Sequence, residues 1–439
     1  MQWLLSEGQR LVLPGLSAEL TVRQGLGSGT QGQVYAVDYG AQTLALKWYF
    51  PSTLELDPEL GKRLAHAISS GSPSAHFLWP QALAGDPQSP TNGLGYLMQL
   101  RPAAYVPAQD HMAGRMQLDL QTALSFAFEL AEAFHALHSL GLCYKDISLG
   151  NVFLNPHLAS ILICDNDNVT VDGKGETVVL GTPGFMAPEI LRGEQLPCAG
   201  TDLFSLAVLI FRLLTRHDPF RGCQELALSC LDAGNLKRLY GDAPVFIFDP
   251  EDNSNRPDPQ HHLGVLLSWP IYPEVLRSCF VQTFVKGLRH PQLRTLTGEW
   301  KRVLAKCLDQ RLICQACNQE AFPALASTGR CWSCGAPLPA VPQLVAGHGV
   351  EVTLSPGNRL HRHHLQPGEG ESLNAPLGMC VSHPSEPQRV GLQNCSDQCW
   401  QVELCDGSQR SLAPGAHIDT SRLKRVLTPW GVARVVRPA

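Results

Sequence analysis

Two carboxylates and one amide follow a helix-like segment in close succession, and they limit the folds open to this chain. Residues 117–139 carry apolar side chains at the i, i+3 and i+4 spacing of an amphipathic helix. Directly after this segment, Asp146 and Asn151 have the spacing D-x-x-x-x-N, and Asp165 ends the apolar stretch ILIC. This order of helix, polar loop and strand predicts a fold that combines helices with sheets and brings the three side chains together.

The three side chains offer the hard oxygen ligands that Mg²⁺ prefers. Asp146 would accept or orient the proton of an attacking hydroxyl group, while the Asn151 amide oxygen and the Asp165 carboxylate would bind the ion. Phosphate oxygens and water molecules would complete the coordination. The spacing is therefore typical of a catalytic loop that works with magnesium and phosphate groups.

A glycine-rich turn lies upstream of these residues. Gly27, Gly29 and Gly32 read G-x-G-x-x-G. Glycines allow a strand–turn–strand backbone to approach phosphates so that its N–H groups face the anionic oxygens. A dinucleotide-binding fold would need a helix after the third glycine, whereas the strand-like QVYAVD follows here. The pattern favours a hairpin that covers phosphates, and an ordinary glycine turn remains the alternative.

β-Branched and aromatic residues predict strands over 19–25, 33–38 and 43–49, and Lys47 lies near the end of the third. Its ammonium group would neutralise phosphates and would be held by a glutamate on a helix; an edge-strand lysine pointing into water is the alternative. We take Glu59 as that glutamate in preference to Glu55, because Asp57-Pro58 before it is typical of a helix start. The alternative is that Glu59 is a glutamate in the first turn of a helix, stabilised only by the helix dipole and not paired with Lys47.

Two cysteine pairs lie further along the chain. Cys314-x-x-Cys317 and Cys331-x-x-Cys334 provide four thiolates, a ligand set that Zn²⁺ binds with tetrahedral geometry. Four protein ligands leave no open position, so we predict a structural zinc ribbon over 311–340 whose folding depends on the metal. A disulfide pair or free thiols are the alternatives.

The last part of the chain is predicted to be a small all-β domain over 345–439. Short alternating runs such as VEVTL and WQVEL are separated there by turn residues. The stretch LHRHHL in this region contains His361, His363 and His364. Because no partner residue for a second metal ion is evident, we interpret this stretch as an exposed strand.

These features, taken in order, resemble the protein kinase family. The resemblance covers about residues 20–305 and is carried by the glycine turn, Lys47, Asp146, Asn151, Asp165, Ala187-Pro188-Glu189, Asp202 and Arg294. It implies a bilobal α+β fold, with a β-rich N-lobe in 1–100 and a helical C-lobe in 101–310. It also implies transfer of the γ-phosphate of ATP, bound with Mg²⁺, to serine or threonine hydroxyl groups of a protein partner or of the chain itself. Glu189 and Arg294 would form a buried ion pair, since charges at such depth need partners.

A closer resemblance is to a bacterial group of serine/threonine kinase-like proteins with a C-terminal zinc ribbon. It is carried by FLWPQAL at 77–83, GYLMQL at 95–100, the segment 202–222 and the cysteine pairs. This resemblance implies two partners, a PP2C-type phosphatase and a von Willebrand A-type protein, encoded in tellurite-resistance-like clusters.

The resemblance also places the adenine of ATP beside GYLMQL. Met98 would occupy the gatekeeper position, with ordinary core packing as the alternative. Gln99 and Leu100 would offer backbone groups to the edge of the base, and Val34 and Ala45 would cover its faces.

Two motifs depart from the family pattern. Tyr144-Lys145-Asp146 replaces His-Arg-Asp, and Lys145 offers a phosphate only a point charge, although it would help at the γ-phosphate. Asp165-Asn166-Asp167 replaces Asp-Phe-Gly and removes an apolar plug. Because the lysine, both aspartates and the asparagine remain, we expect an active enzyme. An ATP-binding pseudokinase or scaffold, acting through the zinc ribbon and the β domain, is the alternative.

Composition and charge argue against several other classes of protein. The chain has 34 Lys and Arg against 39 Asp and Glu, a net charge of −5, which argues against a nucleic-acid binder, although a zinc ribbon could bind one. The longest apolar run, at 203–211, is too short to span a bilayer, and from the residues of the N-terminus we expect no secretory signal. The 15 cysteines, an odd number, do not form a disulfide framework, so we expect reduced thiols in the cytoplasm.

Overall fold

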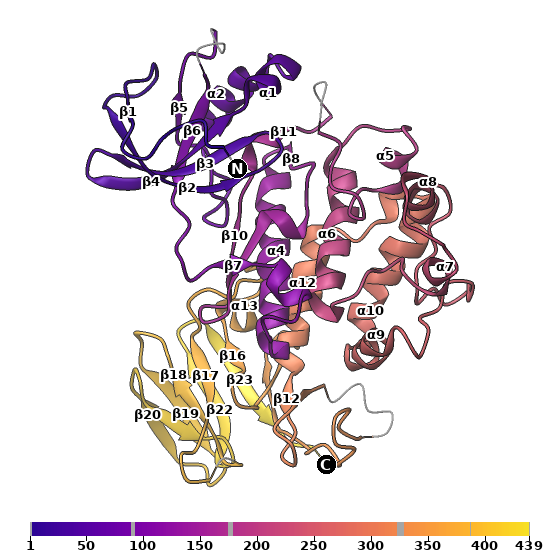
Figure 1. Ribbon diagram of the computed structural model, residues 1–439. Coiled ribbons are helices and arrows are strands. Elements are labelled where there is room, and N and C mark those ends of the chain that lie inside the picture. The colour runs from indigo at the N-terminus through magenta and orange to yellow at the C-terminus, as the bar shows by residue number, and fades with distance from the viewer. Residues whose placement is uncertain (1, 89–92, 174–178, 323–328, 387, 439) are drawn as a thin grey trace. The chain divides into compact units, whose positions relative to one another are not determined.

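A computed structural model describes residues 2–88, 93–173, 179–322, 329–386 and 388–438 (Figure 1). The chain divides into two compact units. The first comprises Met1–Gln117, Glu129–Asp258 and Val281–Thr297, and the second comprises Leu118–Phe128, Pro259–Phe280 and Gly298–Ala439. Both units therefore combine segments that are distant in the sequence.

An antiparallel six-stranded sheet opens the first unit, with the order β1-β2-β3-β4-β6-β5. Its strands are β1 (Arg10–Leu11), β2 (Leu20–Ser28), β3 (Gly32–Tyr39), β4 (Gln42–Tyr49), β5 (Ala82–Ala84) and β6 (Gly95–Gln99). Strands β2, β3 and β4 agree with the three strands that the sequence predicts. Leu44 and Leu46 of β4 pack into one apolar cluster and Ala45 into another, because successive side chains of a strand point to opposite faces. The second cluster includes Leu54 of α1 (Pro51–Leu56) and Leu64 of α2 (Leu60–Ser70).

Helices follow this sheet, as the expected bilobal fold requires. The long helix α4 (Leu120–Ser139) corresponds to the helical segment predicted over 117–139, and the long helix α6 (Ala199–Thr215), which contains the apolar run 203–211, is buried over most of its surface. The short elements between Val106 and Lys237 are β7 (Val106–Pro107), α3 (Gln109–Met112), β8 (Leu142–Cys143), β9 (Val152–Asn155), β10 (Ser160–Ile163), β11 (Thr170–Val171), α5 (Pro188–Leu191), α7 (Cys223–Leu226) and α8 (Ala233–Lys237). None of the helices within the described ranges has a stretch both long and apolar enough to cross a bilayer.

A buried ion pair lies between α5 and the segment after α11 (Gly287–Arg289). Arg294 donates from its two terminal nitrogens to the Glu189 oxygens at 2.7 and 2.8 Å, and their side chains are 0% and 6% exposed. Arg294 also donates to the Gly200 carbonyl at 2.9 Å and lies 5.2 Å from the centre of the Phe204 ring. The ion pair expected from the sequence is therefore confirmed.

The second unit contains helices and two β-sheets. Its elements before the sheets are α9 (Leu263–Ser268), α10 (Glu274–Val281, whose last residue lies in the first unit), α12 (Thr297–Gln310, whose first residue lies in the first unit) and the strand pair β12 (Leu312–Ile313) and β13 (Glu320–Ala321). One sheet has six strands in the order β15-β14-β23-β22-β19-β20, and the other has four in the order β16-β17-β18-β21. Their bounds are β14 (Gln343–Ala346), β15 (Glu351–Thr353), β16 (Arg359–Leu360), β17 (Gly378–Ser382), β18 (Val390–Asn394), β19 (Trp400–Leu404), β20 (Gln409–Leu412), β21 (His417–Asp419), β22 (Leu423–Thr428) and β23 (Gly431–Val436). Side chains from both sheets, among them the fully buried Trp400, share one apolar core.

The histidines of LHRHHL do not lie in an exposed strand. His361 and His364 are 3% and 1% exposed, and Arg362–Leu365 form the short helix α13. The His361 backbone N–H donates to Nδ1 of His364 at 2.9 Å, and Nε2 of His364 lies 3.1 Å from Asp309. The sequence-based interpretation of this stretch is wrong, because Asp309 on α12 supplies a partner that the local sequence does not reveal.

Candidate active site

Lys47 of β4 lies among acidic side chains in the first unit. Its Nζ is 2.8 Å from Oδ1 of Asp165 and 2.8 Å from Oδ2 of Asp167, and it donates to Gln31 at 3.2 Å. The lysine is 4% exposed. Burial alone would lower the pKa of Lys47, but the Asp167 and Asp165 carboxylates hold it above its ordinary value. Lys47 is therefore a fixed, desolvated positive charge.

The segment Asp165-Asn166-Asp167 follows β10 and turns sharply. Asp165 has a left-handed backbone with φ of 57°, which directs the next two side chains inward. The Asn166 amide donates to the carbonyls of Leu78 and Ile163 at 2.8 and 3.0 Å, so a hydrogen-bonded amide lies where the family has its phenylalanine. Asp167 is fully buried and accepts a 2.5 Å hydrogen bond from the Tyr49 hydroxyl.

Asn151 and Asp165 lie at the same end of one hairpin. Val152 of β9 is opposite Ile163 of β10, and the Cys164 N–H donates to the Asn151 carbonyl at 2.9 Å. The antiparallel pairing therefore places the residue before β9 beside the residues after β10. The hairpin brings together the two residues to which the sequence assigns Mg²⁺. Their binding of the ion stays a prediction.

Asp146 lies in contact with Asn151. The Asn151 amide nitrogen donates to the Asp146 backbone carbonyl at 2.9 Å and to its carboxylate at 3.3 Å, and the Thr182 hydroxyl donates to the other carboxylate oxygen at 2.6 Å. The amide nitrogen of Asn151 is used in this way, so its oxygen is the atom suited to a cation.

Asp202 of α6 fixes the loop that carries Asp146. Its carboxylate accepts the backbone N–H groups of Tyr144 and Lys145 at 2.7 and 2.9 Å, and His138 lies 3.1 Å away. Lys145 has a left-handed backbone with φ of 75° and is 7% exposed. Burial lowers its pKa. The loop is thus held through its backbone by a buried carboxylate.

The acidic groups fit a divalent cation. Burial raises the pKa of Asp165, Lys47 lowers it, and the neighbouring Asp167 charge raises it again, with a smaller effect of Asp146 in the same direction. One lysine thus faces several carboxylates, and Oδ1 of Asp167 is buried without a hydrogen-bond partner. A magnesium ion would offset this excess of negative charge with the ligand types that it prefers.

The structure does not bring Glu59 to Lys47. Glu59 precedes α2, its side chain is 63% exposed, and it pairs with Lys62 at 2.9 Å. Asp167 occupies the place beside Lys47 that the sequence assigns to a helix glutamate. The only signal for this exchange is the carboxylate at a position where the family has glycine.

The glycine turn joins β2 to β3. The Gly29 N–H donates to the Gly32 carbonyl at 2.9 Å. A Cβ atom at Gly32 would lie 2.3 Å from the Trp48 carbonyl oxygen, so no side chain fits there, whereas a Cβ atom at Gly27 would meet open space. Gly32 therefore serves close strand packing, and the open side of the turn at Gly27 leaves room for a ligand.

The residues expected around the adenine lie on adjacent strands. Val34 pairs with Lys47 across β3 and β4, and Ala45 pairs with Met98 across β4 and β6. Ala45 and Met98 are buried in one apolar cluster, against which Val34 and Leu100 pack. Gln99 is exposed at the end of β6. The core-packing reading of Met98 is thus correct, and its contact with a base stays a prediction.

The four cysteines of the two pairs meet in the second unit. Their sulfur atoms lie within 4.8 Å of one another, with 3.7 Å between Cys314 and Cys334 and between Cys317 and Cys331. Burial alone would raise the pKa of Cys314, but backbone N–H groups of Ala316 and Cys317 contribute to lowering it to about 7. A thiol that ionises near neutral pH is well suited to bind a metal.

Comparison with known proteins finds similarity to protein kinases. Residues 97–312 match the family described as protein kinase domain. Protein kinase C delta type of Mus musculus is 32% identical over 119 residues, which cover 26% of this chain and 17% of that protein. Serine/threonine-protein kinase ppk6 of Schizosaccharomyces pombe is 25% identical over 223 residues, 49% of this chain and 29% of that protein. The chain is also similar to mitogen-activated protein kinase kinase kinase mom-4 of Caenorhabditis elegans, at 26% identity over 134 residues, 30% of this chain and 25% of that protein. The matched parts cover less than a third of each of these relatives. The matches support a protein kinase domain in this chain.

Proposed function

We propose that this chain is a protein kinase that transfers the γ-phosphate of ATP to serine or threonine hydroxyl groups of a protein partner or of itself. The observation that carries the proposal is the set of contacts that joins Lys47 to Asp165, the preceding Cys164 to Asn151, and Asn151 to Asp146. Each member has the chemistry that phosphoryl transfer needs, and the similarity to kinases covers the same segment of the chain from residue 97 onward.

In this proposal the chain mainly positions groups and stabilises charge. Lys47 holds the α- and β-phosphates. Asp146 orients the hydroxyl group of the substrate and accepts its proton, and Lys145 supports the γ-phosphate. Asn151 and Asp165 would hold Mg²⁺, which would supply charge neutralisation at the phosphates. Gly27, Gly29 and Gly32 would cover the phosphates.

The direct test is transfer of labelled γ-phosphate by the purified full chain with Mg²⁺ and ATP. We expect label on the chain or on a generic protein substrate, recovered as phosphoserine or phosphothreonine after hydrolysis. ATP that raises the melting temperature without any transfer would contradict the enzyme and favour the alternative, an ATP-binding scaffold. Label on tyrosine would contradict the specificity alone.

We propose that Asp167 acts as a positioning residue for Lys47. Asp167→Asn should lower kcat/KM for ATP by about 10–100-fold, because a hydrogen bond to a charged group contributes about 1.5–3 kcal/mol. The measurement is steady-state kinetics at varied ATP concentration. Glu59→Gln, which removes an exposed ion pair, is the matched control and should leave kcat/KM unchanged.

A double variant separates positioning from stability. If Asp167 acts through Lys47, Asp167→Asn should cause little further loss of activity in a Lys47→Met background. Independent losses from the two substitutions would show that Asp167 serves the fold and not the lysine.

We propose a structural zinc ion bound by Cys314, Cys317, Cys331 and Cys334 within a ribbon over 311–340. Cys317→Ser should reduce the zinc content of the purified chain by one equivalent, measured by elemental mass spectrometry, because a four-thiolate site loses most of its affinity with one ligand. Cys405→Ser, an exposed cysteine outside the group, should leave the zinc content unchanged. Equal zinc content in both variants would contradict the site.

The division of the chain into domains, its partners and its location are also proposals. The kinase lobes would occupy 1–100 and 101–310, and a small β domain would occupy 345–439. The resemblance to the bacterial kinase-like group suggests a PP2C-type phosphatase and a von Willebrand A-type protein as partners. The fifteen cysteines, all within the described ranges, form no disulfide there, which supports the proposal of a cytoplasmic location.

A further inference from the structure

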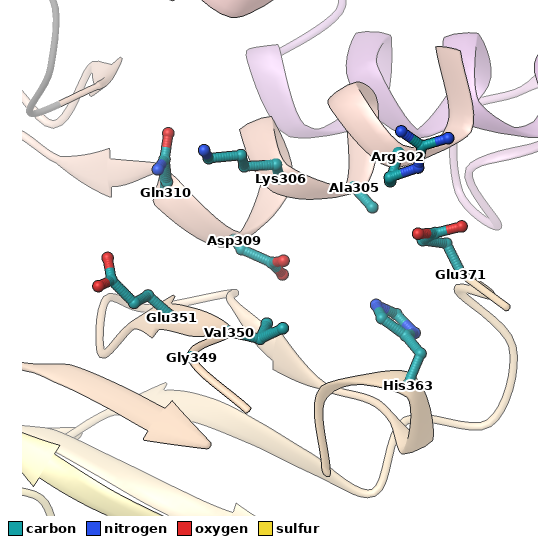
Figure 2. A pocket seen from close by; sticks show the side chains of 10 residues that line it. All are labelled: Arg302, Ala305, Lys306, Asp309, Gln310, Gly349, Val350, Glu351, His363 and Glu371. Carbon is teal, nitrogen blue, oxygen red and sulfur yellow. The ribbon is translucent and has the colours of Figure 1, made fainter. Parts of the chain in front are cut away.

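A cavity of about 370 Å³ in the second unit is lined by residues that the proposed phosphotransfer does not use (Figure 2). Asp309 from the last turn of α12, His363 from α13 and Glu371 from the following loop contribute to its wall. Figure 2 shows the Asp309 carboxylate directed toward the His363 ring, with Glu371 on the same side of the cavity as His363. Two acidic groups and an imidazole thus open onto one space.

Asp309 is a buried carboxylate without a cationic partner. It is 9% exposed, and within the described ranges no lysine or arginine forms an ion pair with it. Its contact is with His364, whose Nε2 lies 3.1 and 3.2 Å from the two carboxylate oxygens. Burial raises the pKa of Asp309, and His364 lowers it only in part. Buried carboxylates are usually paired with a cation or bound to a metal ion.

His364 cannot serve as that cation at low cost. Its Nδ1 accepts the His361 backbone N–H at 2.9 Å, so the neutral ring carries its proton on Nε2 and donates it to Asp309. Protonation of Nδ1 would place a second donor against the His361 N–H. His364 therefore orients the Asp309 carboxylate as a neutral hydrogen-bond donor, which is the usual role of residues around a metal ligand.

His363 presents a ring nitrogen that lacks a partner. Its Nε2 is buried and has no hydrogen-bond partner in the described structure, and the same holds for Nδ1 of the neighbouring His361. Nδ1 of His363 accepts a long hydrogen bond, 3.4 Å, from the Ser372 backbone N–H, so an ion at Nε2 requires the ring proton to move to Nδ1 and this long hydrogen bond to be given up. A neutral imidazole is the form that binds metals.

We propose that Asp309 and His363 bind a divalent transition-metal ion, with Zn²⁺ as the favoured ion, and that His364 holds the Asp309 carboxylate in place. The ligand atoms available from Asp309, His363 and His364 lie within 4.8 Å of one another, so a single ion can reach Asp309 and His363 together. Glu371 and water molecules complete the coordination. A set of one imidazole and carboxylates suits Zn²⁺ better than Mg²⁺ or Ca²⁺, which prefer oxygen ligands alone.

The surroundings hold the two ligands at a fixed separation. The Asn358 amide donates to the carbonyls of Asp309 and Arg311 at 3.3 and 2.8 Å, at the end of α12, and to the Thr353 carbonyl at 2.9 Å. The helix that carries Asp309 is thus tied to the strands beside α13. This preorganisation favours a structural ion that links the end of α12 to the β-rich part of the same unit.

The charges that line the cavity also favour a cation. Asp309, Glu351 and Glu371 face Arg302 and Lys306, so acidic groups outnumber basic ones before the imidazole is considered. A phosphate group would place its charge against three carboxylates and is the less favourable occupant.

The test compares the zinc content of the full chain with that of three histidine variants. After incubation with Zn²⁺ and gel filtration, the parent chain should retain one equivalent more than His363→Ala, measured by elemental mass spectrometry. His348→Ala, an exposed histidine outside this cavity, should retain as much as the parent chain. His363→Gln, which keeps a polar side chain, should behave like His363→Ala, and melting temperatures near that of the parent would show that both variants fold.

X-ray absorption at the zinc edge distinguishes this ion from one bound by cysteines. The parent chain should show nitrogen and oxygen ligands near about 2.0–2.1 Å in addition to sulfur near about 2.3 Å, and His363→Ala should show sulfur alone. Equal zinc content in the parent chain and the folded His363 variants, or an equal loss in His348→Ala, would overturn the proposal. This result would leave the proposed phosphotransfer untouched, because no residue of the candidate active site is changed.

Discussion

Asp146→Asn is expected to lower the rate of γ-phosphate transfer by about 10²–10⁴-fold, the usual contribution of a positioned general base. The asparagine has nearly the same shape and can still accept the Thr182 hydroxyl hydrogen, which Oδ1 of Asp146 accepts at 2.6 Å. It cannot take up the proton of an attacking hydroxyl group. The loss should therefore appear in kcat, measured with labelled ATP at saturating substrate concentration.

ATP binding serves as the internal control for this variant. Because Lys47 and Asp165 are unchanged, the rise in melting temperature that ATP and Mg²⁺ produce should persist in Asp146→Asn. Asp38→Asn, which changes an aspartate paired with Arg23 on the sheet, should keep full activity. If Asp146→Asn transfers phosphate at the parent rate, Asp146 is not the base and the proposed roles of the loop residues fail with it.

Local sequence patterns predict the parts of this site that depend on neighbouring residues. The strands around the glycine turn follow from their β-branched and aromatic residues, and the helix α4 follows from its apolar spacing. Asp146 and Asn151 contact each other because five positions of one tight loop separate them. Such features require no knowledge of distant segments.

The partner of Lys47 could not be predicted in the same way. Glu59 and Asp167 both offer a carboxylate, and Asp167 lies 120 positions from the lysine. The choice depends on the turn after β10, where the left-handed backbone of Asp165 directs Asp167 toward β4. A turn of this kind has no clear signature when an aspartate replaces glycine, so the sequence favours the helix glutamate of the family.

The histidine cluster was missed for a related reason. Asp309 lies 55 positions before His364, on a helix that the sequence does not connect with the β-rich region. Four residues of helix, as in α13, are too few for an apolar period to distinguish them from a strand. The burial of these histidines depends entirely on the packing of α12 against the segment that contains them.

Glu189→Ala is expected to lower the free energy of unfolding by about 3–5 kcal/mol, because it leaves the Arg294 guanidinium buried without its counter-charge. Arg294 would keep its hydrogen bond to Gly200 and its contact with Phe204, but neither offsets a full positive charge in an apolar environment. Chemical denaturation followed by tryptophan fluorescence provides the measurement. Glu194→Ala, which breaks the exposed pair with Arg192, is the matched control and should leave the free energy of unfolding nearly unchanged.

The double variant Glu189→Met with Arg294→Met separates the cost of an unpaired charge from the net contribution of the pair. Burying two apolar side chains avoids the desolvation of both ions, so the double variant should be more stable than Glu189→Ala, even though the Gly200 carbonyl loses a donor. A double variant that is less stable than Glu189→Ala would show that the ion pair itself, and not the avoidance of an unpaired charge, stabilises the segment before α6. Phosphate transfer by the folded double variant would then report whether the Asp146 loop needs this anchor or depends only on Asp202.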